Sequence, residues 1–175
     1  AERSTLEAID ISERPIAITH ANPLFFHNAL RNKSNDILKA LGESGGIIGF
    51  SLYPFHLKNG SDCTLQDFCQ MIVDAADIVG INQVAIGSDL CEQWDYSKLE
   101  WMRSGRWTFG ADYGEGSAAK KEWPKQPDWF TGSQDIKNIA TGLSAVGLDS
   151  NDVNKVMGTN WLNFFDHSFD PRCNK

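Results

Sequence analysis

The chain has 175 residues, of which 41% are hydrophobic and 22% are charged, and its net charge is −7. This composition is typical of one folded domain and excludes a disordered or fibrous chain. The acidic balance, without a basic stripe, argues against nucleic acid as a main partner. No apolar run reaches the roughly 18 residues of a membrane-spanning helix.

The first residues, 1–4, lack the apolar core of a signal peptide. We interpret them as a mature or truncated start. The compartment stays open, with a cytoplasmic or otherwise soluble location favoured.

The first part of the chain alternates helix and strand. Apolar spacing predicts a short helix at residues 4–11. The β-branched run 16–19 predicts a strand that ends at His20. The Asn-rich stretch 21–33 is expected to be a loop, and a helix follows at 34–41 with its first residue, a serine, as the N-cap.

The same alternation continues to residue 89. Buried strands are predicted at 47–52 and 84–87. Between them, a loop at 53–62 precedes a helix that begins at Thr64 with a capping-box-like start and runs to about Ile78. Apolar strands alternating with helices predict a parallel α/β sheet, in which chemistry gathers at the carboxyl ends of the strands.

The second half of the chain begins with a tryptophan-rich stretch. Five of the six tryptophans fall within residues 91–131. We interpret 91–132 as an ordered insertion within a single domain, residues 1–175, and leave open whether it is a lid, a partner surface or plain packing. Helices are then predicted at 133–146 and from Ser150, which is expected to cap its helix, followed by a turn at 158–160.

The cysteines are not spaced as a zinc ribbon. None of the four forms a C-x-x-C pair: Cys63, Cys69, Cys91 and Cys173. We expect free thiols, while disulfides stay open from the sequence.

Three polar side chains stand at or just after the predicted strands. His20 can offer a neutral imidazole nitrogen to zinc. Arg31 can offer two parallel N–H donors to a carboxylate, and Asp89 can bind metal or move a proton. Each also has a purely structural interpretation. His20 can be a hydrogen-bonded histidine at a strand end, Arg31 a surface ion-pair partner, and Asp89 a helix N-cap.

Four segments follow one another in a recognisable order: Arg14–Asn22, Arg31–Asp36, Gly45–Gly49 and Ile86–Asp89. They are similar to a strand ending in Ser-His, an Arg-Asn-x-x-Asp helix start, a Gly-Gly strand and a strand ending in Gly-x-Asp. This order of motifs resembles the membrane (renal) dipeptidase family, peptidase family M19. The segment Gly158–Leu162 also resembles the family's Gly-x-Asn-x-Leu.

The resemblance implies the C-terminal part, about strands 6–8 with flanking helices, of a metal-dependent-hydrolase (β/α)8 TIM-type barrel. It further implies a zinc-dependent dipeptidase in which two zinc ions activate the water that attacks a dipeptide. On that template, His20 binds one zinc, Arg31 grips the free carboxylate of the substrate, and Asp89 handles the proton between water and the leaving amine.

Much of the family's metal site has no match in this sequence. The family's His-x-Asp on the first strand, its bridging Glu and its fifth-strand His are all missing. One imidazole does not hold two zinc ions, because each site needs three or four donors. We therefore expect the chain to bind metal weakly at most and to be inactive alone. The Gly-x-Asp motif also continues differently, as Leu90-Cys91-Glu92 instead of Phe-Asp-Gly, which leaves the choice of dipeptide open.

The other histidines and functions stay as alternatives. His27 and His56 are candidates for contact with substrate or are solvated loop residues, whereas His167 is expected to be uninvolved. The alternative function is a non-catalytic barrel module that is truncated or self-associating, with a second copy or the missing N-terminal half as its partner. A deaminase-like or phosphotriesterase-like barrel is disfavoured, because such chemistry does not need a carboxylate-binding Arg31.

Overall fold

The computed structural model describes residues 2–92, 97–98 and 124–170. Three strands in these residues form a parallel sheet in the order β1 (Ala17–Ile18), β2 (Ile47–Phe50) and β3 (Val84–Ile86). In register, Ile18 lies beside Ile48, and Ile48 lies beside Val84. The parallel α/β sheet predicted from the sequence is confirmed. The interpretation of residues 91–132 as an insertion falls mostly outside the described residues.

Helices precede each strand, as the alternating pattern predicts. They are α1 (Glu2–Ile11), α2 (Asn35–Glu43) and α3 (Leu65–Val79). The Ser34 side chain caps α2 by accepting the Ile37 N–H, and Thr64 caps α3 by accepting the Asp67 N–H. Thr64 also donates its hydroxyl to the Asp67 carboxylate over 2.7 Å, so the two side chains of the expected helix start are hydrogen-bonded to each other.

The C-terminal helices differ from the prediction in two places. A 3-10 turn, η5 (Ser133–Asp135), leads into α5 (Ile136–Ala145), and then come α6 (Ser150–Asn154), the π-helical turn η6 (Lys155–Thr159) and α7 (Asn160–Phe169). The N-cap of α6 is Asp149, not Ser150, because the Asp149 carboxylate accepts the Asp152 N–H over 2.9 Å. The expected turn at 158–160 is a kink between two helical segments, where the Gly158 backbone is non-helical.

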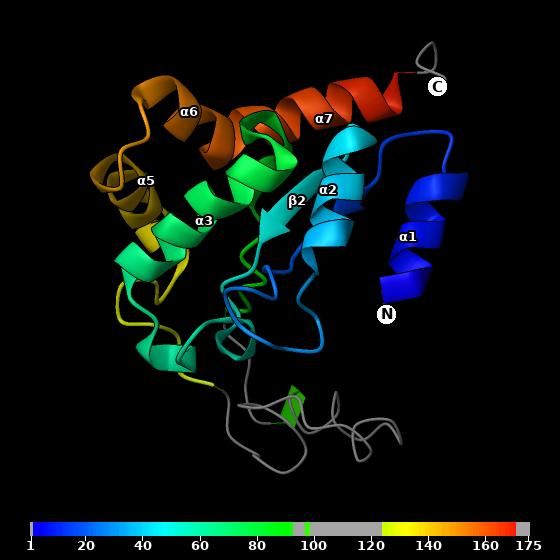
Figure 1. Ribbon diagram of the computed structural model, residues 1–175. Coiled ribbons are helices and arrows are strands. Elements are labelled where there is room, and N and C mark those ends of the chain that lie inside the picture. Colours follow the sequence, from blue (N-terminus) through cyan, green and yellow to red (C-terminus); the bar gives the residue numbers. More distant parts are fainter. Residues whose placement is uncertain (1, 93–96, 99–123, 171–175) are drawn as a thin grey trace.

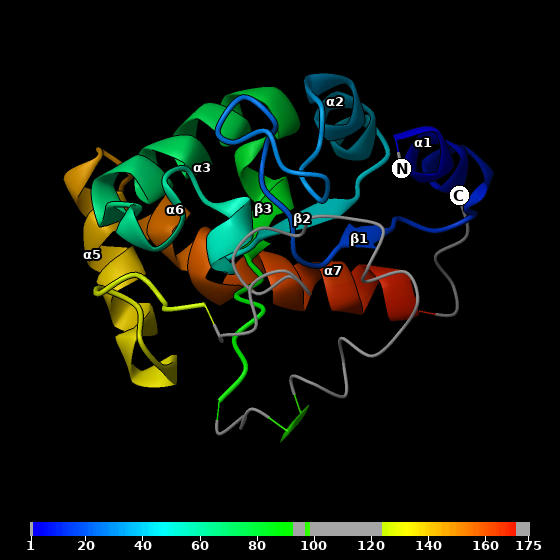
Figure 2. The same cartoon turned by 90° about the horizontal axis from the view of Figure 1, so that it is seen from below.

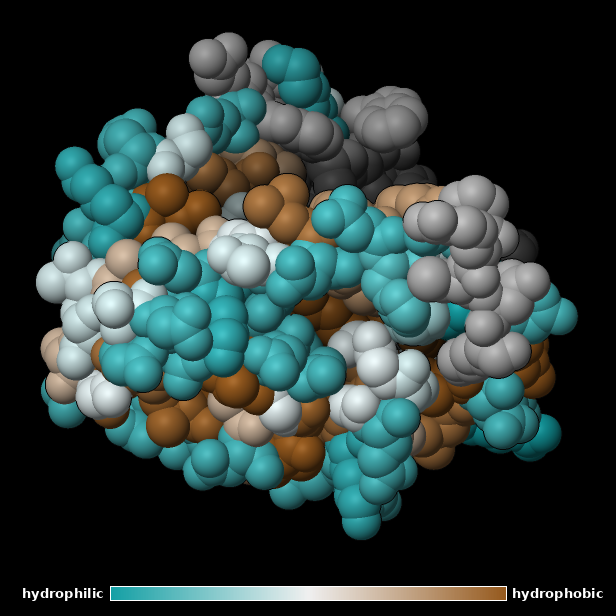
Figure 3. Space-filling model, turned by 90° about the horizontal axis from the view of Figure 1, so that it is seen from above, coloured by the Kyte–Doolittle hydropathy of each residue, from teal (hydrophilic) through white to brown (hydrophobic). Residues whose placement is uncertain are grey.

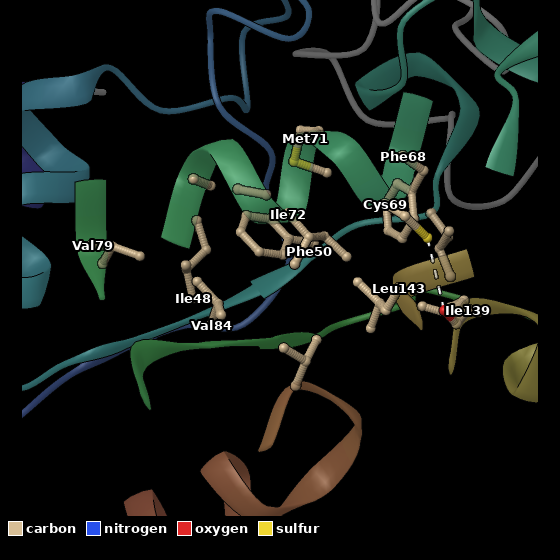
Figure 4. Close-up of a cluster of buried hydrophobic side chains, with 14 of the residues drawn as sticks. Ile48, Phe50, Phe68, Cys69, Met71, Ile72, Val79, Val84, Ile139 and Leu143 are labelled. Atoms are coloured by element: carbon tan, nitrogen blue, oxygen red, sulfur yellow. Dashed lines mark hydrogen bonds between the residues drawn. The ribbon is translucent and has the colours of Figure 1, made fainter. Parts of the chain in front are cut away.

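The sheet lies between two layers of helices. Figure 2 shows the strands with α2 and α3 on one side and α7 on the other. The core fills the space between β2 and α3, where Ile48 and Phe50 meet Phe68 and Ile72, all completely buried (Figure 4). Burial of apolar surface of this kind is the main stabilising contribution to the fold.

Glycines let α7 approach the second face of the sheet. A side chain at Gly49 would collide with the Trp161 ring of α7 and with the Thr19 carbonyl, and one at Gly87 would also meet the Thr19 carbonyl. The Trp161 indole N–H donates to the Ile86 carbonyl over 2.9 Å and so anchors α7 to β3. The absence of a side chain at Gly49 therefore leaves room for the Trp161 ring.

The surface of α7 carries apolar side chains. Leu162, Phe165 and Phe169 are 66%, 45% and 73% exposed, and the rings of Phe165 and Phe169 are stacked. Figure 3 looks down on the end of the molecule where α7 lies and shows brown apolar patches among the polar residues. Among the described residues, no helix has the length and apolar character required to span a membrane.

Candidate functional site

The carboxyl ends of the three strands share one edge of the sheet, at the lower end of the strands in Figure 1. Hydrogen bonds continue the pairing beyond the strands: the Ala21 N–H donates to the Gly49 carbonyl over 3.1 Å, and the Leu52 N–H donates to the Ser88 carbonyl over 3.2 Å. The segments that follow each strand, which contain the sequence-predicted site residues, are thus tied to the same edge.

His20 is half-buried and follows the end of β1 by two residues. Its Nδ1 shares a hydrogen bond of 2.9 Å with the Thr19 hydroxyl. If Nδ1 carries the proton, Nε2 keeps its lone pair and can act as a metal ligand. This geometry is compatible both with a metal ligand and with a hydrogen-bonded structural histidine.

His56 is the most deeply buried imidazole near this edge. It belongs to the 3-10 turn η1 (Pro54–His56), within the segment expected to be a plain loop, and it is only 5% exposed. A second such turn, η2 (Gly60–Asp62), follows it. The His56 Nδ1 shares a hydrogen bond of 2.8 Å with the Ser51 hydroxyl, which also accepts the Tyr53 N–H.

Positive charges gather around His56. Burial lowers the pKa of His56 to about 3, and the charge of Arg31 is the next largest cause, followed by that of His20. His27 and Lys33 act on the His56 pKa in the same direction. Burial and the Arg31 charge also lower the pKa of Lys33. The structure therefore brings His20 and Arg31 into one electropositive neighbourhood with residues that were left open or unnoticed in the sequence.

Arg31 itself is exposed. An exposed guanidinium can offer a pair of N–H donors to a carboxylate that arrives from solvent. His27 is half-buried and meets the Phe55 ring edge-on, with 6.4 Å between the ring centroids. An anionic group is the ligand that the positive charges of Arg31 and Lys33 would attract.

Asp89 stands apart from this group. It is exposed, and its backbone is left-handed with φ 56°, which few residues other than glycine adopt. Within the described residues, no hydrogen bond or ion pair joins Asp89 to His20 or Arg31. Its neighbour Ser88 is nevertheless bonded to Leu52, so Asp89 follows β3 at the same edge of the sheet.

The zinc donors expected from the family are not gathered here. In the part of the chain that the structure describes, no group of three or more His, Cys, Asp or Glu side chains could hold a metal ion. His20 alone does not fit a zinc site, which takes three or four protein donors. The described residues are thus suited to an anion and do not by themselves form a metal centre.

The described cysteines are free thiols, as expected for Cys63, Cys69 and Cys91. A cavity of about 300 Å³ lies away from the candidate site, beside the start of β2 and α7. Its walls include Gly46, Asn82, Asn163 and His167. It contains none of the residues predicted for catalysis or substrate binding.

A comparison of the chain with known families completes the description of the site. The family model for membrane dipeptidase, peptidase family M19, matches residues 1–99. This chain belongs to that family. The matched region includes His20, Arg31 and Asp89, the three residues singled out by the motif order.

Known relatives agree with this assignment. An uncharacterised dipeptidase of Schizosaccharomyces pombe is 29% identical over 91 residues, which make up 51% of this chain and 22% of that protein. An amidohydrolase of Pseudomonas aeruginosa has a similar structure, with a TM-score of 0.77 and 25% identity over 92% of this chain and 48% of its own.

A metallopeptidase of Rhodobacter sphaeroides bound to a phosphinate mimic of L-Ala-D-Ala gives a TM-score of 0.72 at 16% identity, over 96% of this chain and 40% of its own. This chain therefore spans about half the length of these solved structures and less of the curated relative.

Proposed function

We propose that this chain is part of a zinc-dependent dipeptidase and supplies the side of the active site that binds the free carboxylate of a dipeptide. The placement of the Arg31 and Lys33 charges close to buried His56, at the carboxyl ends of the strands, carries the proposal. A cluster of cations at the carboxyl ends of parallel strands suits an anionic substrate group. Membership of the dipeptidase family supports the same substrate class.

Within this proposal, the sheet corresponds to about strands 6–8 of a (β/α)8 barrel. The likeness to about half of an amidohydrolase structure supports that correspondence. Arg31 donates two N–H groups to the substrate carboxylate, His20 contributes one imidazole donor, and Asp89 accepts or returns a proton beside the scissile bond.

The chain by itself is proposed to be inactive, because the zinc donors beyond His20 are missing from the described residues. The test is hydrolysis of L-alanyl-L-alanine by the purified chain with zinc, against a control with zinc alone. We expect no hydrolysis above the control. Metal-dependent turnover would contradict the proposed inactivity.

Binding provides the positive test of the proposal. Nuclear magnetic resonance titration with L-alanyl-L-alanine should shift the Arg31 Nε–H resonance, whereas L-alanyl-L-alaninamide, which lacks the carboxylate, should not. The Arg31→Lys variant keeps the charge but loses the planar pair of donors, and we expect it to bind the dipeptide more weakly. Equal shifts with both ligands would contradict carboxylate binding.

A second candidate function is a non-catalytic module that associates with a second copy of itself. The exposed apolar side chains of α7, Leu162, Phe165 and Phe169, favour this function. Sedimentation velocity should then show a dimer that the Phe169→Ser variant weakens. A monomer at all accessible concentrations would rule this candidate out.

A further inference from the structure

Two buried asparagines lie directly beside the candidate site residues. Asn22 is 0% exposed and follows His20 by two positions, and Asn32 is 6% exposed and follows Arg31. The Asn32 side-chain oxygen accepts the Asn22 backbone N–H over 2.9 Å. One hydrogen bond thus joins the segment that carries His20 to the segment that carries Arg31.

The asparagine side chains also reach the segment that follows β2. The Asn22 amide group donates to the carbonyls of Ser51 and His56, each over 3.0 Å, and the Asn22 side-chain oxygen accepts the Ser51 N–H over 2.9 Å. Asn32 donates to the same His56 carbonyl over 3.1 Å and to the His27 carbonyl over 2.8 Å. We call Asn22 and Asn32 with these bonds the asparagine clamp.

The backbone closes the base of the same loop. The Lys33 N–H donates to the Asn22 carbonyl over 2.8 Å, and the Leu24 N–H donates to the Lys33 carbonyl over 2.8 Å. Pro23 and Lys33 consequently form a short parallel bridge. Residues 24–32 therefore form a loop whose two ends meet at this bridge. His20 precedes the bridge by three residues, and Arg31 lies two residues before Lys33.

We propose that Asn22 and Asn32 are positioning residues that hold His20 and Arg31 in a fixed relation over the Ser51–His56 turn. This inference rests on the proposed function for its purpose, the placement of a dipeptide carboxylate. A buried amide is costly unless its donors and acceptors are paired, and these two side chains pair theirs with three separate segments. Such a network specifies one loop geometry, because any other leaves buried polar groups without partners.

The test compares Asn22→Asp and Asn32→Asp with a matched control, Asn28→Asp, in the full chain. All three changes add one negative charge to the same loop, but Asn28 is exposed and outside the clamp. The two clamp variants keep the side-chain acceptor and lose the amide donors. Asn32→Ala serves as an uncharged fourth variant if an aspartate prevents folding.

Two measurements are made on each folded protein. The amides of residues 22 and 51 should exchange with deuterium about tenfold faster or more in the clamp variants. Asn32→Ala removes the oxygen that accepts the Asn22 N–H. The aspartate variants keep the accepting oxygens but lose the amide donors to buried carbonyls, so the loop should open more often. The resonances of the His20 ring and the Arg31 Nε–H should shift in the same variants. In Asn28→Asp, we expect both measurements to match the unmodified chain.

The results separate this inference from the proposed function. Rapid exchange of residues 22 and 51 in the unmodified chain, or unchanged His20 and Arg31 resonances in the clamp variants, overturns the positioning role. A shift of equal size in Asn28→Asp also overturns it, because charge alone then explains the effect. If the chain binds no dipeptide, the proposed function fails, while the resonances still decide whether the clamp sets the geometry.

Discussion

The Ser51 hydroxyl and the His56 Nδ1 share a hydrogen bond of 2.8 Å in a place where His56 is 5% exposed. The hydroxyl also accepts the Tyr53 N–H, so the turn after β2 is built around this pair. Burial and the surrounding cations keep His56 neutral by lowering its pKa to about 3. The burial of neutral His56 should therefore make the stability of the fold depend on pH.

The free energy of unfolding should decrease as the pH falls from 6.5 toward 3. Because the His56 pKa is lowered from 6.5 to about 3, the unfolded chain takes up a proton in this range and the folded chain does not. His56 then contributes a slope of at most about 1.4 kcal/mol per pH unit, and its contribution to stability is complete above pH 6.5.

Urea unfolding at several pH values would measure this slope. The His56→Gln variant should lose part of it, whereas His167→Gln, which removes an exposed imidazole, should retain the slope of the unmodified chain. Identical slopes in the unmodified chain and in His56→Gln would show that His56 is not buried in its neutral form.

Replacing Gly87 with alanine should destabilise the fold. The added methyl group would meet the Thr19 carbonyl just after β1 and the Gly49 backbone of β2. We expect a loss of about 1–3 kcal/mol, as for other overpacked sites. Gly158→Ala is the control, because a side chain there meets nothing within 4 Å. Equal unfolding midpoints for the two variants would mean that the backbone around Gly87 leaves room for a methyl group.

The thiols of Cys63 and Cys69 should resist alkylation in the folded chain. Both are buried, and burial raises the pKa of each to about 12, so little thiolate forms at pH 8. Cys91 is half-buried and should react sooner. Mass spectrometry after timed iodoacetamide treatment would measure this order. Rapid labelling of Cys69 without unfolding would contradict its place beneath α5, where its thiol meets the Ile139 carbonyl.

Added zinc should not raise the melting temperature of the chain. A ligand stabilises a protein only when it binds the folded state well below the concentration used, and the described residues offer no three-donor site. Thermal unfolding with zinc and with a chelator would test this expectation. A higher melting temperature in zinc, lost in His20→Ala, would instead reveal a complete metal site that includes His20.

Local features of the fold followed from the sequence alone. The caps at Ser34 and Thr64 involve hydrogen bonds that reach only three residues along the chain, so nearby residues suffice to predict them. The three apolar strands and the order of motifs likewise indicated a parallel sheet and the dipeptidase family. The N-cap of α6 was misassigned by one residue because Asp149 and Ser150 are adjacent and both belong to residue types that cap helices well.

Only the tertiary structure revealed the burial of His56, the asparagine clamp and the position of α7. Each depends on contacts between distant residues: Asn22 with His56, and Trp161 with Ile86. The sequence shows that Asn22 and Trp161 can donate hydrogen bonds. Their acceptors come from distant parts of the chain, so only the folded structure identifies them. For the same reason, the sequence indicated His20 and Arg31 as members of one site but left His56 open, and only the fold shows that His56 is buried with the charge of Arg31 nearby.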